Sequence, residues 1–154
     1  MTIWPRILCA ATSLLPISAV AQDEERANFF NDPFLQVTDA IANCPRPEEP
    51  RITRSEMRAQ SHVRAERGTS CFQSGRCRLP NAYLYDKEII ARVKKAILAD
   101  GRFSRSSIWV EGQRRWVWLK GCVESQQHAL YIEQLVRNID DVQAVIHQLS
   151  IVGK

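Results

Sequence analysis

The sequence predicts an α/β (α+β) fold over residues 86–152, an α-β-β-α-β two-layer sandwich. Apolar residues recur at helical spacing in two segments, and they alternate with other residues in three shorter ones. A hairpin followed by a helix and a strand favours a three-stranded mixed sheet with both helices on one face. Residues 22–85 are expected to form a helical N-terminal extension stapled by disulfides.

The first helix is predicted from Asp86 to Asp100, with Gly101 as the stop signal. Its apolar face consists of Ile89, Ile90, Val93, Ala96 and Ile97. A short strand through Ile108 and Val110 then turns back at residues 112–114.

The partner strand covers residues 116–123, and Ser125 caps the second helix. That helix ends before Asp140-Asp141, and the last strand covers residues 145–152. The order of elements therefore follows from local patterns alone.

The extension contains two predicted helices. Asp32-Pro33 is typical of a helix start, with Asp as N-cap and Pro at the first helical position, so a helix is expected to run up to Cys44. The prolines of "CPRPEEP" (44–50) make an extended connector. "TRSE" (53–56) matches a capping box and opens a polar, surface-lying helix towards Gly68.

Residues 1–21 read as a signal peptide, because Arg6 precedes an apolar run that ends in Ala19-Val20-Ala21. A retained anchor is the alternative, but the run is short and contains Pro16. We expect cleavage to leave no transmembrane segment and to place the protein in the periplasm, where it can bind the membrane peripherally.

Four cysteines remain after residue 21, and an exported protein meets an oxidising compartment. Cys71 and Cys77 bracket a loop that can close on itself, which leaves Cys44 to pair with Cys122. Sequence alone leaves the two other pairings open. No C-x-x-C spacing is present, so neither a metal site nor a redox pair is expected.

Trp109, Trp116, Trp118 and Cys122 are expected on the sheet face opposite the helices. An exposed tryptophan face would invite association. We expect the N-terminal extension to cover this face, stapled there through Cys122. The alternative is that the tryptophans form a ligand or partner surface.

The second half of the chain resembles the BON-domain family of bacterial osmotically induced and nodulation proteins. The residues that carry the resemblance are Asp86, Ile89, Val93, Leu98-Ala99-Asp100, Ile108-x-Val110, Val117-x-Leu119-x-Gly121-x-Val123, Val142-x-x-Val145 and Leu149-x-Ile151. Asp141 and His147 depart from the usual residues, as do Trp118 and Cys122. The resemblance covers a single copy and implies a non-enzymatic envelope module that binds phospholipid surfaces or envelope partners.

No catalytic motif is present, and the three histidines are scattered, so no enzyme activity, cofactor or metal is expected. Residues 22–85 hold nine basic and nine acidic side chains, whereas residues 86–154 hold eleven and eight. This mild excess does not fit a nucleic-acid surface.

The basic residues near element ends suggest a contact with anionic phospholipid. Basic side chains around an aromatic ring provide attraction and an interfacial contact. The predicted site consists of Arg102, Phe103, Arg105, Arg114 and Arg115, with Lys87, Lys94 and Lys95 on the flank of the first helix. The alternative, which the sequence alone favours, is that these residues form an ordinary solvated surface. We therefore expect a non-catalytic exported module in envelope maintenance, with lipid or an envelope protein as partner. The alternative is a structural or adaptor subunit of an envelope assembly.

Overall fold

The structure is a computed structural model that describes residues 24–152. The predicted signal peptide and Cys9 lie outside the described residues. The elements in chain order are β1 (Arg26–Ala27), β2 (Phe34–Asp39), β3 (Ile52–Thr53), α1 (Arg54–Glu66), α2 (Thr69–Gln73), η1 (Ala82–Tyr85), α3 (Asp86–Ala99), η2 (Gly101–Phe103), β4 (Ser107–Gln113), β5 (Trp116–Val123), α4 (Gln126–Arg137) and β6 (Ala144–Ile151).

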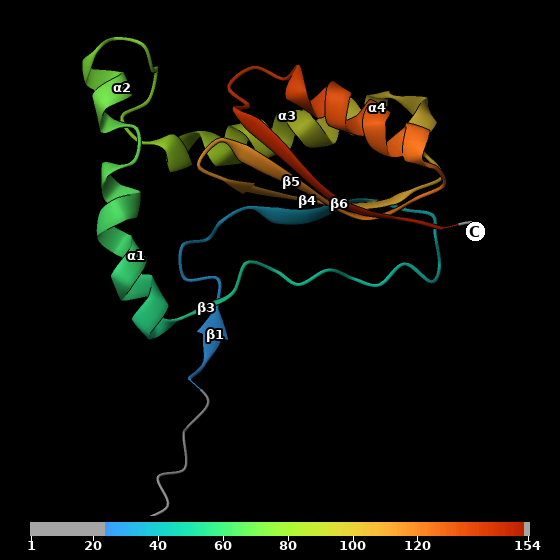
Figure 1. The fold of residues 1–154 in the computed structure, drawn as a ribbon, viewed down its shortest axis with the longest axis horizontal. Coiled ribbons are helices and arrows are strands. Elements are labelled where there is room, and N and C mark those ends of the chain that lie inside the picture. The colour runs from blue at the N-terminus through green and yellow to red at the C-terminus, as the bar shows by residue number, and fades with distance from the viewer. Residues whose placement is uncertain (1–23, 153–154) are drawn as a thin grey trace, which may run out of the picture.

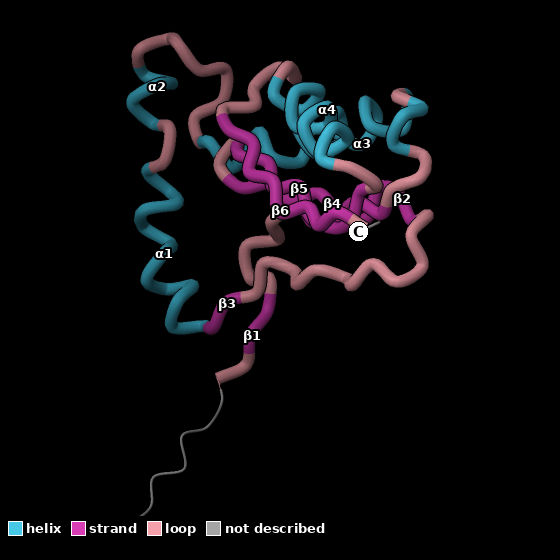
Figure 2. Tube along the Cα trace, turned by 45° about the vertical axis from the view of Figure 1, so that its right-hand side comes forward, coloured by secondary structure: helices cyan, strands magenta, loops and turns pink. Residues whose placement is uncertain are grey.

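Helices α3 and α4 lie together on one face of a mixed sheet, which confirms the two-layer fold class (Figures 1 and 2). The strand order is β2-β4-β5-β6; β5 and β6 run parallel and the other pairs run antiparallel. The sheet has four strands, not the expected three, because β2 comes from the N-terminal extension.

The prediction of a helix after Asp32-Pro33 is wrong, because this segment forms strand β2. The spacing of Phe34 and Val37 fits a helix locally, but β4 offers an unpaired edge that the backbone of this segment joins. Leu35 and Val37 then pack against the core. Asp32 binds Arg64 and Gln113 with its side chain instead of capping a helix.

The proline-containing connector is extended, as predicted, and it runs beneath the sheet on the face away from the helices (Figure 1). A disulfide joins Cys44 to Cys122, and Lys120 donates to the Glu48 carbonyl at 3.3 Å. Trp109 is only 4% exposed. The extension therefore covers this face, but it does so as an extended chain and not as a helix.

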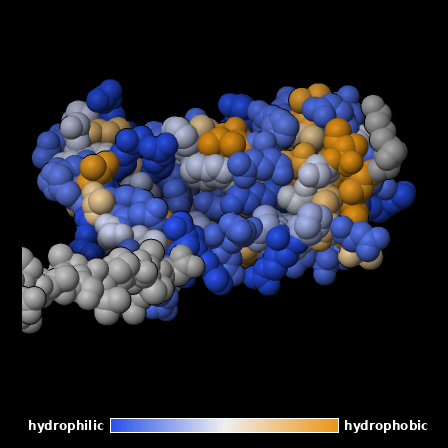
Figure 3. Space-filling view, turned by 60° about the horizontal axis from the view of Figure 1, so that its bottom comes forward, coloured by the Kyte–Doolittle hydropathy of each residue, from blue (hydrophilic) through white to orange (hydrophobic). Residues whose placement is uncertain are grey.

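The surface on the connector side is largely hydrophilic over its middle, and hydrophobic residues gather at one end (Figure 3). Trp116 and Trp118 are half-buried beneath it, with ring centroids 6.1 Å apart. Lys120 and Glu111 form an ion pair of 2.6 Å with both side chains largely covered. On the tryptophan face, Trp109 is therefore buried, whereas Trp116 and Trp118 are only partly covered.

Helix α1 stands apart from the sandwich, and none of its residues is buried (Figure 1). Thr53 and Glu56 form the predicted capping box. Close to its C-terminal end, the Arg64 guanidinium lies between the rings of Phe30 and Tyr83, at 3.9 and 3.7 Å. The second predicted disulfide joins Cys71, within α2, to Cys77 and closes the loop that follows this helix. We call residues 54–78 the arm.

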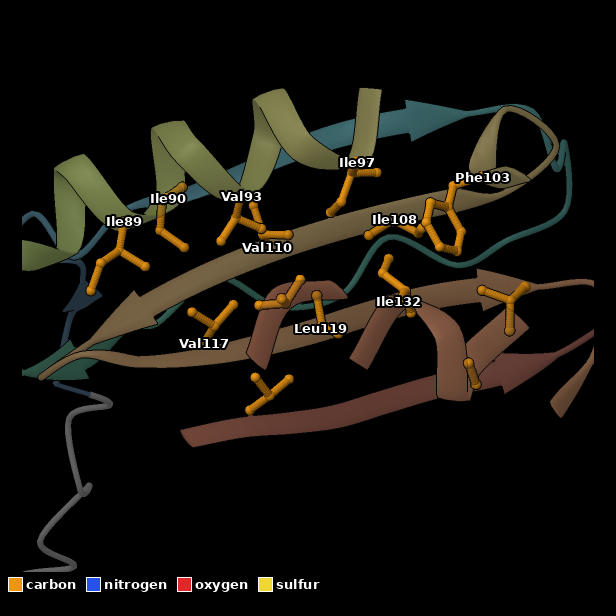
Figure 4. Close-up of a cluster of buried hydrophobic side chains, with 14 of the residues drawn as sticks. Ile89, Ile90, Val93, Ile97, Phe103, Ile108, Val110, Val117, Leu119 and Ile132 are labelled. Carbon is orange, nitrogen blue, oxygen red and sulfur yellow. The ribbon is translucent and has the colours of Figure 1, made fainter. Parts of the chain in front are cut away.

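The core fills the space between the helices and the sheet (Figure 4). It includes Ile89, Val93, Val110, Leu119 and Ile132, each completely shielded from solvent or nearly so. Gly121 has a φ of 112°, and a Cβ atom there would lie 2.1 Å from the Ser107 carbonyl oxygen. Glycine is therefore needed here for the close approach of β4 and β5.

Candidate interaction surface

The basic residues expected to act together lie at opposite ends of the sandwich. Arg102 and Arg105 precede β4, whereas Arg114 and Arg115 follow it. A strand of seven residues separates the two groups by roughly 20 Å. The structure therefore places these residues in two separate groups and not in one cluster.

Phe103 does not reach the solvent. It is 1% exposed and points into the core from η2 (Figure 4). The short turn between α3 and β4 brings its ring over the end of the sandwich, where it packs with the other buried residues. Phe103 therefore stabilises the fold and cannot form an apolar contact with a membrane.

Arg115 is also an internal residue. Its side chain is 16% exposed, donates to the Asp141 carbonyl at 2.8 Å and stacks over the Tyr85 ring at 4.7 Å. Its neighbour Arg114 lies over the ring of Trp116 at 3.8 Å. Arg115 thus holds the hairpin against the loop between α4 and β6.

The two arginines near η2 are partly neutralised. Arg102 donates from Nε to Asp100 at 2.9 Å, and this hydrogen bond holds the pKa of the carboxyl below its usual range. The same bond raises the pKa of Arg102 above its usual range. Arg105 forms an ion pair of 2.7 Å with Glu124. Little positive charge is left free at this end.

The three lysines of α3, unlike Arg102 and Arg105, are not neutralised by nearby carboxylates in the described residues. Lys87, Lys94 and Lys95 are exposed, and none of them forms an ion pair within residues 24–152. Leu84 and Leu98, both 55% exposed, lie at the two ends of the same stretch. The helical period places the three lysines and Leu98 on the side of α3 that faces away from the buried Ile89, Val93 and Ile97, and Leu84 lies in η1 directly before the helix.

We call this surface the α3 outer face. It comprises Leu84, Lys87, Ala91, Lys94, Lys95 and Leu98. Sequence reasoning identified the lysines and placed them at the flank, but it missed both leucines. The signal was available, because residues 84, 87, 91, 94 and 98 follow the 3–4 spacing of a single helical stripe.

The first residue of α3 fixes the far end of the sandwich. Asp86 is 1% exposed and accepts hydrogen bonds at 2.7 Å from the backbone N–H groups of both Arg114 and Arg115. These two residues have φ values of 51° and 68°, so the carboxylate holds a hairpin turn in the left-handed region. Burial raises the pKa of Asp86 to about 6, although the two N–H groups oppose the shift.

Residues 85–153 match the family model of the BON domain. This chain carries a BON domain. The match begins at Tyr85 and takes in α3, the hairpin, α4 and β6. No curated protein matches the chain.

The BON domain accounts for the sandwich without β2, and it is generally a non-enzymatic, envelope-associated module. In the part of the chain that the structure describes, no helix has the length and apolar character needed to cross a membrane. The α3 outer face belongs to the BON domain except for Leu84, which directly precedes it.

The arm is a second basic region, outside the BON domain. It contains six arginines and two glutamates, a concentration hidden by the balanced charge of residues 22–85 as a whole. Three of its arginines make internal contacts: Arg54 over Phe29, Arg64 with Asp32, and Arg78 with Glu88. Arg58 and Arg67 are exposed and form no ion pair within the described residues.

Proposed function

We propose that the protein is an exported, non-catalytic module of the cell envelope that binds anionic phospholipid surfaces through the α3 outer face. The observation that carries the proposal is a surface on α3 with three lysines that form no ion pair within the described residues and the half-exposed Leu98, next to the half-exposed Leu84 of the adjoining η1. Lysines attract anionic headgroups while their aliphatic stems and the leucines contact the acyl boundary.

The expected affinity is modest. Each basic residue near an anionic surface contributes on the order of 1 kcal/mol, and salt weakens this attraction. Burying the exposed part of two leucines adds about 1–2 kcal/mol. Arg102, Arg105 and Arg114 contribute only at longer range, because each already has a carboxylate or an aromatic partner. Binding should therefore be reversible.

The compartment proposed is the periplasm. Two disulfides support an oxidising environment, and residues 1–21 have the pattern of a cleaved signal peptide. An envelope protein as partner, with the chain as a structural or adaptor subunit, is the second candidate. The same α3 outer face would then bind an acidic partner, and vesicles would not compete for it.

The test is co-sedimentation of the mature protein with vesicles of rising anionic lipid content, at low and moderate salt. Lys94→Glu with Lys95→Glu should abolish the binding, because it reverses the charge of the α3 outer face. The matched control is Arg58→Glu with Arg67→Glu, which changes the net charge equally but lies on the arm. Binding by the wild type and the control variant, but not by the Lys94→Glu, Lys95→Glu variant, supports the α3 outer face as the lipid-binding site. Equal loss in both variants, or no binding by the wild type, refutes it.

A further inference from the structure

We infer that strand β6 pairs antiparallel with β6 of a second copy of this chain. Within the described residues, β6 lies at one edge of the sheet, with β5 on one side and no strand on the other (Figure 1). An unpaired edge presents a row of free backbone N–H and C=O groups, which is a template for another strand.

The two edges of this sheet differ in their protection. β2, the opposite edge, follows Pro33, carries a register irregularity between Gln36 and Thr38, and ends at Asp39. Prolines, bulges and charges all discourage strand addition. In contrast, β6 reads "AVIHQLSI", eight residues without proline, glycine, lysine, arginine or a carboxylate. Only β6 is open to a partner.

The hydrogen-bonding side of each β6 residue follows from one contact. Val152 donates its N–H to the Val123 carbonyl of β5 at 3.0 Å. Because backbone groups alternate in direction along a strand, Gln148 and Ser150 also face β5. The backbone groups of the intervening residues then point away from the sheet, towards the open edge. These residues are Val145, His147, Leu149 and Ile151.

A two-fold axis through Gln148 uses all of these outward groups. It sets Val145 opposite Ile151 and His147 opposite Leu149, each as a hydrogen-bonded pair. Ile151, which is 43% exposed, gains an apolar neighbour on the helix side of the sheet. No charged side chain faces another, so two copies of this cationic chain meet without local repulsion.

A second copy fits better than an unrelated peptide, because the pairing consumes the one open edge of each molecule and closes at two copies. The two-fold axis is perpendicular to the plane of the sheet, so the helices of both copies lie on the same side of the joined sheet. The dimer then presents two α3 outer faces to one membrane, and both can bind at once. This consequence rests on the proposed lipid contact.

The experiment is light scattering and sedimentation on the mature, oxidised protein over a range of concentrations. The expected result is a dimer. His147→Pro removes an outward N–H without breaking a bond to β5, and it should weaken the dimer at least about tenfold, because two interchain hydrogen bonds are lost. His147→Ala is the matched control and should remain dimeric. A monomeric wild type, or a dimer indifferent to His147→Pro, overturns the inference.

A second variant tests the register even if the proline variant does not fold. Gln148→Cys places two thiols on the axis with Cα atoms about 4.5 Å apart, and oxidation should link the two chains. Ser150→Cys lies off the axis and should not link. Equal linking of both variants, or of neither, contradicts the pairing. Lys94→Glu with Lys95→Glu should leave the dimer intact, which separates this result from the lipid test.

Discussion

The carboxylate of Asp86, the first residue of α3, accepts the backbone N–H of Arg115 at 2.7 Å and thereby ties the helix to the β4–β5 hairpin. The Arg114 N–H reaches the other carboxylate oxygen. Asp86→Ala leaves both donors without this acceptor in a partly buried site. We expect a loss of about 1–3 kcal/mol in the free energy of unfolding at neutral pH, measured by urea denaturation. Asp140→Ala, an exposed carboxylate, should change stability little.

The raised pKa of Asp86 predicts that the stability of the fold depends on pH. The pKa of Asp86 rises from 3.8 to about 6 on folding, so the folded state binds this proton more tightly than the unfolded state. This proton-linked contribution to stability, which is separate from that of the two hydrogen bonds, is complete below pH 3.8 and disappears as the pH rises through 6. A shift of this size corresponds to about 3 kcal/mol.

The measurement is the difference in unfolding free energy between wild type and Asp86→Ala at several pH values. This difference should be larger at pH 4 than at pH 7 and level off above pH 7. A difference that stays constant, or that grows with rising pH, would show that Asp86 does not titrate in this way.

The Cys44–Cys122 disulfide fastens the connector over the tryptophan face. Denatured, unreduced mature protein should contain no reactive thiol, and its peptide map should join Cys44 to Cys122 and Cys71 to Cys77. Cys44→Ser with Cys122→Ser removes a link across 78 residues and should cost about 2–5 kcal/mol. The tryptophan fluorescence should shift to longer wavelength if the connector lifts and exposes this face. Linkage of Cys122 to Cys71 or Cys77 would refute the pairing.

Arg64 positions the arm. Its guanidinium stacks between two rings and forms an ion pair with Asp32 that is largely shielded from solvent. Lysine keeps the charge but loses the planar stacking, so Arg64→Lys should accelerate amide hydrogen exchange throughout α1. Arg58→Lys, on the exposed part of the same helix, is the control. Equal exchange rates in both variants would show that Arg64 does not anchor the arm.

Local patterns were sufficient for most of the BON domain. The buried stripe from Ile89 to Ile97 gave α3, and the alternation in residues 116–123 gave β5 with its observed bounds. Cysteine number and loop length favoured one of three possible pairings, and the structure contains that one. The missing strand, β2, depends on an edge provided by residues about 70 positions later, and no local spacing reports such a partner.

The candidate surface was predicted less well, because charge in a sequence does not report exposure or pairing. Phe103 and Arg115 occur in loop sequences yet are buried by tertiary packing. Arg102 and Arg105 find carboxylates nearby. Only the lysines, whose exposure follows from the helical period of their own segment, kept their predicted place.

The most direct test of the lipid contact is the environment of Ala91, at the centre of the α3 outer face. An environment-sensitive fluorophore on Ala91→Cys should shift its emission to shorter wavelength with anionic vesicles but not with zwitterionic ones. A label on His62→Cys, exposed on the arm, should not shift. Vesicle binding that leaves the label at position 91 unchanged would contradict the account.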